Sequence, residues 1–186
     1  MIFIKDEEFL RGDCPMTKEE VRILSIAKLE LEEDHSVLDI GAGTGSVTIQ
    51  AAKICCNGEV VGIERDSEAL DTIYKNINKF QCNNIKIIEG EAIEAFNDIK
   101  GEFNRIFIGG SGGNIEDIIK NYAKLLKDKG KMVLNFITID NLYKAMSTLK
   151  ALGFSVECSQ VSISKTKGRS SMLFAGNPIF IVEAKK

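Results

Sequence analysis

The residues whose types and spacing could do chemistry gather where predicted strands end. In SVLDIGAGTGSVTI (36–49) an apolar segment runs into Gly41, Gly43 and Gly45, and a helical pattern follows from Ser46. Three glycines at one strand–helix turn exceed what a turn requires, which indicates the close approach of a small molecule. A dinucleotide-binding turn has the spacing G-x-G-x-x-G, and its third glycine would fall on Ser46. The tighter spacing found here disfavours a pyrophosphate cradle.

Two acidic positions close the next two predicted strands. Glu64 ends the apolar strand EVVGIE (59–64), where a carboxylate can accept hydrogen bonds from both hydroxyls of a ribose. Glu91 and Ala92 lie in EGEA (89–92), which closes the third strand, and this acid with its neighbouring backbone could meet an adenine edge. Ligands of open parallel sheets bind at the carboxyl ends of the strands, so these positions are expected to share one pocket.

The elements that must position these residues follow from apolar periodicity. Apolar runs predict seven strands, and helical spacing predicts helices between most of them. The predicted strands are 36–40, 59–64, 84–88, 104–108, 131–136, 154–163 and 178–184. The predicted helices begin at Thr17, span 46–55, 67–80 and 92–97, begin at an Asn114 cap, and run from an Asp140 cap to Leu152.

Strands that alternate with helices favour an α/β fold, with a mostly parallel seven-stranded sheet and helices on both faces. No helix separates the last two strands, so these should be antiparallel and joined by a polar loop containing SKTKGRSS (164–171). With 186 residues and no linker, we expect an N-terminal arm (1–16) and a single domain (17–186). TKEE (17–20) predicts a capping box, in which the Thr17 hydroxyl accepts a hydrogen bond from a backbone amide.

Composition narrows the classes of function. Hydrophobic residues make up 44% and charged residues 27%, which is typical of a globular protein, and the net charge of −3 disfavours a nucleic-acid partner. No apolar run approaches the ~20 residues of a membrane span, and the charged start is unlike a secretory signal. We therefore expect a cytoplasmic protein with no membrane partner. The five cysteines lack C-x-x-C spacing and His35 is the only histidine, so no metal site is assigned.

The sequence resembles the class I S-adenosylmethionine-dependent methyltransferases in three features taken together. These are DIGAGTG (39–45), Glu64 at the end of the second strand, and the pair Glu91–Ala92 after the third. The resemblance covers about 34–184 and implies a Rossmann-like fold with an antiparallel C-terminal strand. It implies S-adenosylmethionine as the cofactor and S-adenosylhomocysteine as its product. The glycine loop would approach the methionine end, and Asp39 could face the cofactor's ammonium through water. The expected cofactor-binding residues are Thr17, Gly41, Ala42, Gly43, Thr44, Gly45, Glu64, Arg65, Glu91 and Ala92.

The turn after the fourth strand carries information on the substrate. FIGGSGG (107–113) lacks the proline–aromatic turn of amino-group methylators, and its bare backbone suits a bulky, planar ligand. The arm IKDEEFLRGDCPMTKEEVR (4–22) and the turn IFIGGSGG (106–113) resemble the decarboxylating C15-methyltransferases of cobalamin biosynthesis, which act on precorrin-6B with or without cobalt. That resemblance implies a reduced tetrapyrrole substrate, a homotetramer, and cofactor contacts by the turn from Pro15 to Lys18.

A tetrapyrrole with many carboxylates needs cations in its site, because guanidinium groups pair with carboxylates in a bidentate fashion. The basic loop 164–171 is the strongest candidate, since its Gly and Ser residues let it fold over a ligand. Arg22 and Arg105 are further cations that could serve. The expected substrate-binding residues are Gly109, Gly110, Ser111, Gly112, Arg11, Lys18, Lys165, Lys167 and Arg169.

The implied reaction is attack of a nucleophilic meso carbon, C15, on a sulfonium methyl group. The conjugated macrocycle supplies the electron density, so the protein would contribute positioning and a desolvated site rather than a strong base. Loss of carbon dioxide from the ring C acetate then requires a proton source. The candidate acids are Glu7, Glu8 and Asp13 in the arm.

Two other classes of function remain open at this point. One is a class I methyltransferase that acts on RNA or another small metabolite, although an RNA-binding face would need basic residues interleaved with aromatic ones. The chain has no Trp and three Tyr, so this sign is weak. The other is a cofactor-binding module without catalysis, or a dinucleotide-dependent dehydrogenase.

Overall fold

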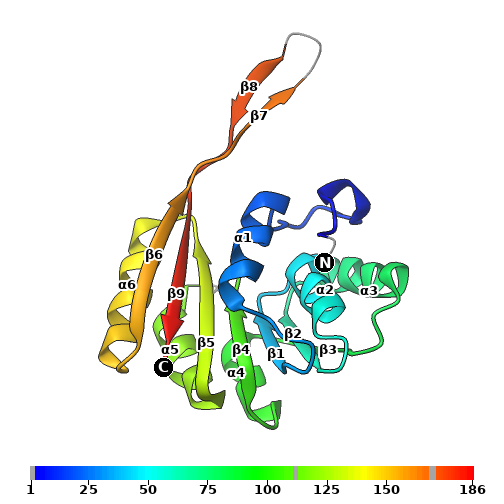
Figure 1. Cartoon of the computed structure of the whole chain (residues 1–186). Helices are drawn as coiled ribbons and strands as arrows, with labels where there is room; N and C mark the ends of the chain where they lie inside the picture. The colour runs from blue at the N-terminus through cyan, green and yellow to red at the C-terminus, as the bar shows by residue number, and fades with distance from the viewer. Residues whose placement is uncertain (1–2, 111–112, 168–170) are drawn as a thin grey trace.

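The computed structural model describes residues 3–110, 113–167 and 171–186 and confirms the α/β fold class. A seven-stranded sheet carries helices on both faces, and a separate two-stranded hairpin projects from it (Figure 1). The strands of the sheet are β1 (Val37–Ile40), β2 (Val60–Glu64), β3 (Ile85–Glu89), β4 (Phe103–Ile108), β5 (Leu126–Phe136), β6 (Ser155–Val161) and β9 (Ile179–Lys185). The α-helices are α1 (Glu19–Leu29), α2 (Ser46–Ile54), α3 (Ser67–Phe80), α4 (Ala92–Ala95), α5 (Ile115–Tyr122) and α6 (Ile139–Ala151).

The strand order is β3-β2-β1-β4-β5-β9-β6. β1 pairs in parallel with both β2 and β4, so the order reverses beside it and a crevice is expected at the carboxyl ends of β1 and β4. β9 lies antiparallel between β5 and β6, as expected from the missing helix. None of the helices in the described ranges is long and apolar enough to cross a membrane.

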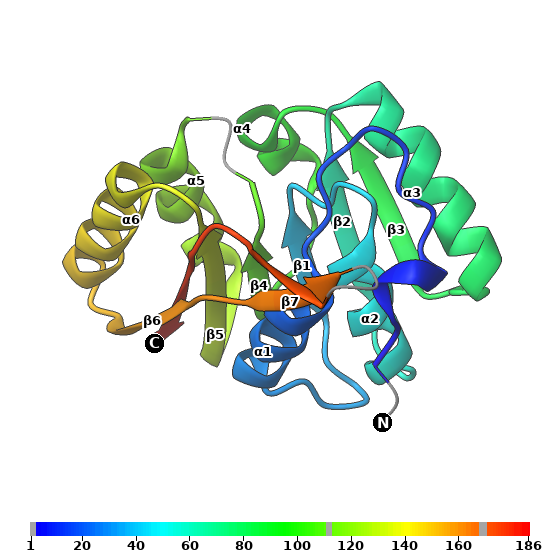
Figure 2. The same ribbon diagram turned by 90° about the horizontal axis from the view of Figure 1, so that it is seen from above.

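Alternate residues along the strands pack into two hydrophobic clusters, one on each face of the sheet. Leu38 and Ile40 of β1 belong to the cluster beneath α5 and α6, whereas Val37 belongs to the cluster beneath α1 and α2. Figure 2 shows α5 and α6 on one side of the sheet and α1 and α2 on the other. Strands buried on both faces need nearly continuous apolar sequence, which is why VLDI and VVGIE read as unbroken runs.

The arm runs over α2 and α3 and is fastened by buried side chains. Arg22 on α1 is fully buried, donates to the carbonyl oxygens of Ile4 and Thr17, and pairs with Asp6 at 3.1 Å. A guanidinium buried among these groups anchors the arm and is not available to a substrate, so the expectation that Arg22 could pair with substrate carboxylates is not met. Asn76 of α3, also fully buried, exchanges hydrogen bonds with the backbone of Leu10.

The start of α1 differs from the predicted capping box. The helix begins at Glu19, Lys18 occupies the N-cap, and no side chain caps the backbone amides. Glu20 does not reach back to the cap, because its carboxylate pairs with Lys165 at 2.5 Å. The Thr17 carbonyl meanwhile accepts a hydrogen bond from the Arg22 guanidinium. The capping-box prediction is therefore wrong, since tertiary partners replace the local ones.

The segment predicted as a polar loop is in fact a β-hairpin. Strands β7 (Ser164–Lys167) and β8 (Met172–Ala175) pair antiparallel, with Thr166 opposite Leu173. The hairpin extends well beyond the carboxyl edge of the sheet (Figure 1). The polar composition of SKTKGRSS concealed a strand, because only the second half of the hairpin, MLFA, is apolar.

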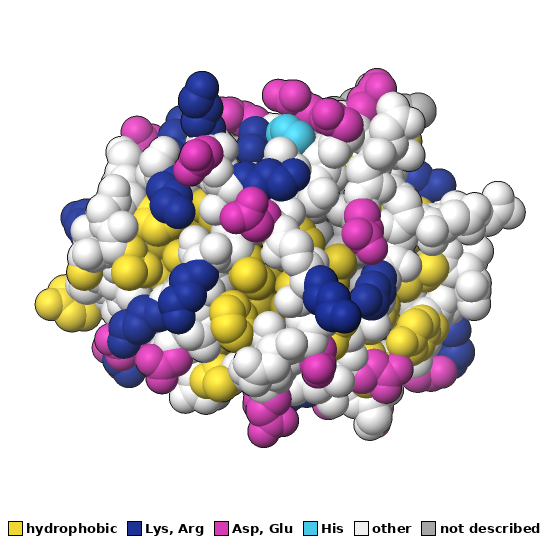
Figure 3. All heavy atoms as spheres, turned by 90° about the horizontal axis from the view of Figure 1, so that it is seen from below, with side chains coloured by type: hydrophobic (Ala, Val, Ile, Leu, Met, Phe, Trp, Pro, Cys, Tyr) yellow, Lys and Arg dark blue, Asp and Glu magenta, His cyan; other side chains and the backbone are white. Residues whose placement is uncertain are grey.

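Charged groups form a network where β9 meets β5 and α1. Burial raises the pKa of Glu183, but hydrogen bonds from Lys131 and Lys185 outweigh burial and lower that pKa to about 2. Lys131 is itself nearly buried and lies 2.9 Å from Glu183 and 2.7 Å from Glu30. Seen from below, the molecule carries Lys and Arg side chains interspersed with Asp and Glu (Figure 3).

The Glu183→Gln variant should lower the free energy of unfolding near neutral pH by about 2–3 kcal/mol, because a buried ion pair then loses one partner. The folded-state pKa of Glu183 is depressed, so its stabilisation is present above the ordinary value of 4.5 and is lost as the pH falls toward 2. Urea unfolding at neutral and acidic pH measures both effects. The exposed Glu102→Gln is the control, and an equal loss in both variants would contradict the prediction.

Candidate active site

A cavity of about 540 Å³ opens at the carboxyl ends of β1 to β5, within the range of small-molecule sites. It has two halves. The first half follows β1, β2 and β3 and is lined by Gly41, Ala42, Gly43, Thr44, Ile63, Glu64, Arg65, Asp66, Ala69, Gly90, Glu91 and Ala92. The second half is built by the arm, α1, β4, β5 and β9, and is lined by Cys14, Pro15, Met16, Thr17, Lys18, Val21, Gly109, Gly110, Asn135, Phe136, Ile137 and Ile179.

The glycine loop allows three backbone segments to meet. Gly41 has φ of +75°, and a Cβ there would lie 2.8 Å from the nitrogen of Gly110 in the turn after β4. A Cβ on Gly43 would lie 3.1 Å from the carbonyl oxygen of Pro15 in the arm. The absence of side chains at Gly41 and Gly43 therefore permits these contacts within the protein and also leaves the cavity wall open.

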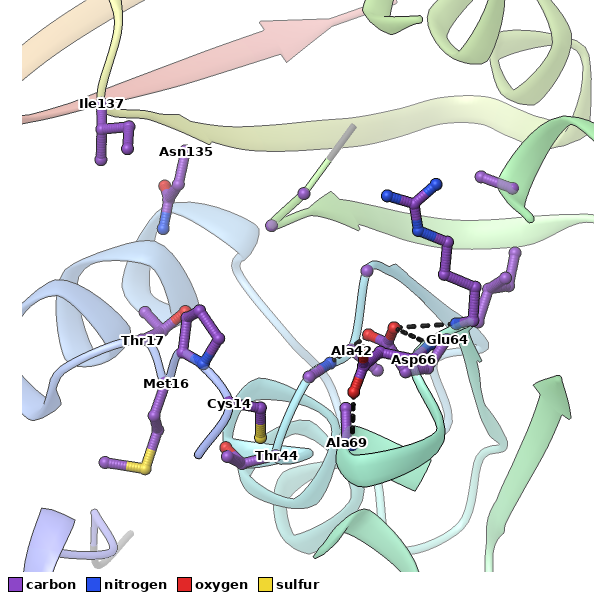
Figure 4. A pocket seen from close by; sticks show the side chains of 18 of the residues that line it. Cys14, Met16, Thr17, Ala42, Thr44, Glu64, Asp66, Ala69, Asn135 and Ile137 are labelled. Carbon is purple, nitrogen blue, oxygen red and sulfur yellow. Dashed lines mark hydrogen bonds between the residues drawn. The ribbon is translucent and has the colours of Figure 1, made fainter. Parts of the chain in front are cut away.

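Glu64 organises the first half through its carboxylate. One oxygen accepts from the Gly43 amide at 2.8 Å, and the other accepts from the amides of Arg65 and Asp66 at 2.8 and 2.9 Å. Figure 4 shows these bonds converging on the Glu64 side chain at the cavity wall. A carboxylate offers about four acceptor positions, so one remains for a ligand hydroxyl.

Arg65 and Glu91 form an ion pair that joins the ends of β2 and β3 at the cavity. Both side chains are partly exposed, with 57% and 39% of their surface accessible, so the pair can open at little cost. Asp66 caps α3 by accepting from the amides of Glu68 and Ala69. Asp66 was not among the expected site residues, although an Asp directly before a helical pattern is a recognisable cap signal.

Asp39 does not line the cavity directly. Its side chain is 1% exposed and accepts a hydrogen bond from the Thr48 hydroxyl, while its other oxygen has no partner among the described residues. Burial raises the pKa of Asp39 to about 7, and the hydrogen bond from Thr48 opposes this only in part. A contact with a ligand ammonium would need a bridging water, as expected, because the carboxylate lies behind the glycine loop.

The second half of the cavity is mostly apolar. Met16 of the arm and Val21 of α1 line it, together with Ile137, which directly follows β5, and Ile179 of β9. Asn135 and Ile137 lie across the cavity from Glu64 and Asp66 (Figure 4). The sequence does hold a signal for Asn135, since this residue interrupts the apolar run KMVLNF near the carboxyl end of its strand.

Comparison with known proteins identifies the family. Residues 8–186 match the model of a family described as a precorrin methyltransferase domain. The chain belongs to this family. It is therefore an enzyme of the methyltransferase class. The match begins in the arm and includes both halves of the cavity and the hairpin, so the resemblance seen in the sequence is confirmed at the level of the family.

Individual relatives match over nearly the whole chain. A Sulfurisphaera tokodaii protein, described as a probable cobalt-precorrin-6B C(15)-methyltransferase (decarboxylating), is 41% identical over 98% of this chain and 97% of its own length. The Salmonella typhimurium cobalt-precorrin-6B C(15)-methyltransferase (decarboxylating) is 38% identical over 98% of this chain and 96% of its own. The structure of precorrin-6y C5,15-methyltransferase from Geobacter metallireducens superposes with a TM-score of 0.93 at 40% identity, covering 98% of this chain and 96% of that chain.

The expected cofactor-binding residues of this family member all line the cavity, with one exception. Gly45 does not line the cavity. A Cβ on Gly45 would lie 2.5 Å from Ile73, so this glycine serves packing of the loop against α3. The expected substrate residues Gly109, Gly110 and Lys18 line the second half.

Other expected cations lie elsewhere. Arg11 pairs with Asp6 at 3.8 Å on the arm, and Lys165 pairs with Glu20 at the base of the hairpin. Lys167 ends β7, and Ser111, Gly112 and Arg169 lie outside the described residues. Arg105 donates to the carbonyl oxygens of Leu29 and Glu30, beyond the end of α1. It therefore caps a helix and, contrary to expectation, is not placed to pair with a substrate at the carboxyl edge.

The three candidate acids do not line the cavity. Glu7 and Glu8 lie in the short 3-10 turn Asp6–Glu8, where a Glu8 oxygen accepts from the Lys5 amide. Asp13 borders a small depression beside the start of α3. A role in proton transfer would require the arm to move, because no described contact brings these carboxylates toward the cavity.

One group of side chains in the described ranges has the types and proximity of metal ligands. Glu32, Asp34 and His35 offer atoms within 4.8 Å of one another in the connection between α1 and β1. His35 accepts from the Glu32 amide through Nδ1, and both acids are exposed, so a structural role for the histidine accounts for the cluster. The group lies at the end of the sheet opposite the cavity.

Proposed function

We propose that this enzyme transfers a methyl group from S-adenosylmethionine to C15 of (cobalt-)precorrin-6B and removes the ring C acetate carboxyl group as carbon dioxide, in cobalamin biosynthesis. The observation that carries the proposal is the full-length match to relatives with this activity in their names, together with a cavity built from two chemically different halves. One half suits a nucleoside, and the other suits a large apolar ring system.

The first half fits S-adenosylmethionine, which supplies an electrophilic methyl group when bound. Glu64 keeps acceptor capacity for one ribose hydroxyl after its three backbone bonds are counted. The glycine loop presents backbone without side chains, and the buried hydroxyl of Thr44 has no partner among the described residues. Glu91, Ala92 and Arg65 border the place where the adenine would lie.

The second half would hold the tetrapyrrole. Met16, Val21, Ile137 and Ile179 exclude water from the ring, which strengthens the electrostatic interactions within the site. Lys18 is the one lysine among the described residues that line the cavity, and it can pair with a substrate carboxylate. Desolvation by apolar walls also favours the loss of carbon dioxide, because the carboxylate charge disperses into the conjugated ring as the bond breaks.

The reaction can be tested by incubating the protein with precorrin-6B, with and without cobalt, and labelled S-adenosylmethionine. Mass spectrometry of the product should show the gain of one methyl group and the loss of one carbon dioxide. A methylated product that keeps every carboxyl group would contradict the decarboxylating step. Labelling of RNA but not of the tetrapyrrole would overturn the proposed substrate.

Glu64→Gln should weaken S-adenosylhomocysteine binding by about tenfold or more, because an amide cannot accept from the backbone and the ribose with both of its polar atoms. Isothermal titration calorimetry measures the affinity. The control is Glu89→Gln, because Glu89 is the register partner of Glu64 on β3 and does not line the cavity. Equal affinities in the two variants would remove Glu64 from the cofactor site.

We also propose that the enzyme is a homotetramer assembled through the β7–β8 hairpin. A two-stranded hairpin is marginally stable alone in water and normally packs against other structure. Here Met172 and Leu173 are 59% and 69% exposed, on opposite faces of a hairpin that stands clear of the body (Figure 1). Apolar side chains on a projecting element are typical of an interface between subunits.

Leu173→Glu should convert the tetramer to a smaller species, because a charge would be buried at the subunit contact. Light scattering after size-exclusion chromatography measures the mass of wild type and variant. Asn97→Glu, which adds the same charge at an exposed turn remote from the hairpin, is the control. A variant that keeps the full tetramer mass would show that the hairpin is not the interface.

A further inference from the structure

Asn135 is the one amide side chain that lines the cavity among the described residues. It lies near the carboxyl end of β5, half-buried, between the apolar neighbours Leu134 and Phe136. Figure 4 shows its side chain extending from β5 toward Thr17, which precedes α1, across the second half of the cavity. An amide among apolar walls orients a ligand by hydrogen bonds rather than by charge.

Ser25 on α1 fixes the orientation of this amide. The Ser25 hydroxyl is fully buried and lies 2.8 Å from the Val21 carbonyl oxygen, one turn earlier in its own helix. It also lies 3.0 Å from Nδ2 and 3.2 Å from Oδ1 of Asn135. A hydroxyl has a single proton, and the shorter bond to Val21 uses it. Ser25 can then only accept, so the Asn135 Nδ2 donates to it.

The second N–H of the Asn135 amide remains available in the cavity. Nδ2 has a second N–H, which has no acceptor among the described residues, and this donor is available to a ligand. The substrate inferred above carries its carboxylates on the periphery of the macrocycle, and they are the strongest acceptors that would reach this wall. Lys18 could neutralise another such carboxylate from its place at the N-cap of α1.

We propose that Asn135 binds a peripheral carboxylate of the tetrapyrrole through its Nδ2–H, with Ser25 acting as the positioning residue that holds the amide in place. This inference rests on the proposed function. A neutral donor suits this reaction better than a cation, because it orients a carboxylate without the strong ion pairing that would oppose loss of carbon dioxide.

The test measures turnover and binding in four variants and in wild type. Asn135→Asp replaces the donor with a negative charge at nearly constant shape, Asn135→Ala removes the amide without adding charge, and Ser25→Ala removes the positioning hydroxyl. Asn78→Asp, the same change as the first variant on the exposed face of α3, is the control. Each is compared with wild type for KM toward precorrin-6B, for kcat, and for S-adenosylhomocysteine affinity, after thermal unfolding has shown that it is folded.

The KM of Asn135→Asp should rise by about tenfold or more, and that of Asn135→Ala by a smaller factor, because only the former repels a carboxylate. Ser25→Ala should raise KM without changing S-adenosylhomocysteine affinity. An Asn135→Asp KM within twofold of the control, or below that of Asn135→Ala, would overturn the inference. Failure of wild type to methylate the substrate would instead overturn the proposed function, and this inference with it.

Discussion

The close contact between the glycine loop and the turn after β4 is the constraint on which the whole site depends. β1 and β4 are neighbours, but the chain leaves them toward opposite helical layers, so the two turns diverge and open a crevice. The turns still meet, because Gly41 carries no side chain and a Cβ there would lie 2.8 Å from the nitrogen of Gly110. Their contact separates a polar half, organised by Glu64, from an apolar half that contains Asn135. A methyl donor and its acceptor can thus face each other across two short stretches of bare backbone.

The arm supplies the remaining wall and is held by buried polar groups. A buried guanidinium is costly unless its donors are paired. The two terminal nitrogens of Arg22 meet two carbonyl oxygens and Asp6, and the guanidinium lies over the ring of Phe9, whereas its Nε has no hydrogen-bond partner among the described residues. Asn76 bonds both to the arm at Leu10 and to the carbonyl of Thr44 in the glycine loop. The arm and the loop therefore share an anchor, and a displacement of one disturbs the other.

Much of this site could be predicted from the sequence, because periodicity locates strands and strand ends locate ligands. The glycine loop and Glu64 were found in this way. Residues whose role depends on a distant partner were not. Glu20 reads as a local cap but pairs with a hairpin lysine, and Arg22 reads as a surface cation but is enclosed by the arm. The role of Asn135 becomes apparent only when the structure shows Ser25, which is far away in sequence, beside it.

The position of β9 constrains the order in which the protein can fold. β6 has no neighbour in the sheet other than β9, which follows it in the chain only after the whole hairpin has been made. β6 therefore cannot join the sheet, nor can β5 cover its outer edge, until β9 has left the ribosome. Until then β5 exposes unpaired backbone groups at the edge of an apolar strand, a state prone to aggregation. The pairing of β9 with β5 and β6 is therefore the last step in forming the sheet. The edge of β5, the strand that carries Asn135, stays unpaired until the last strand has been synthesised.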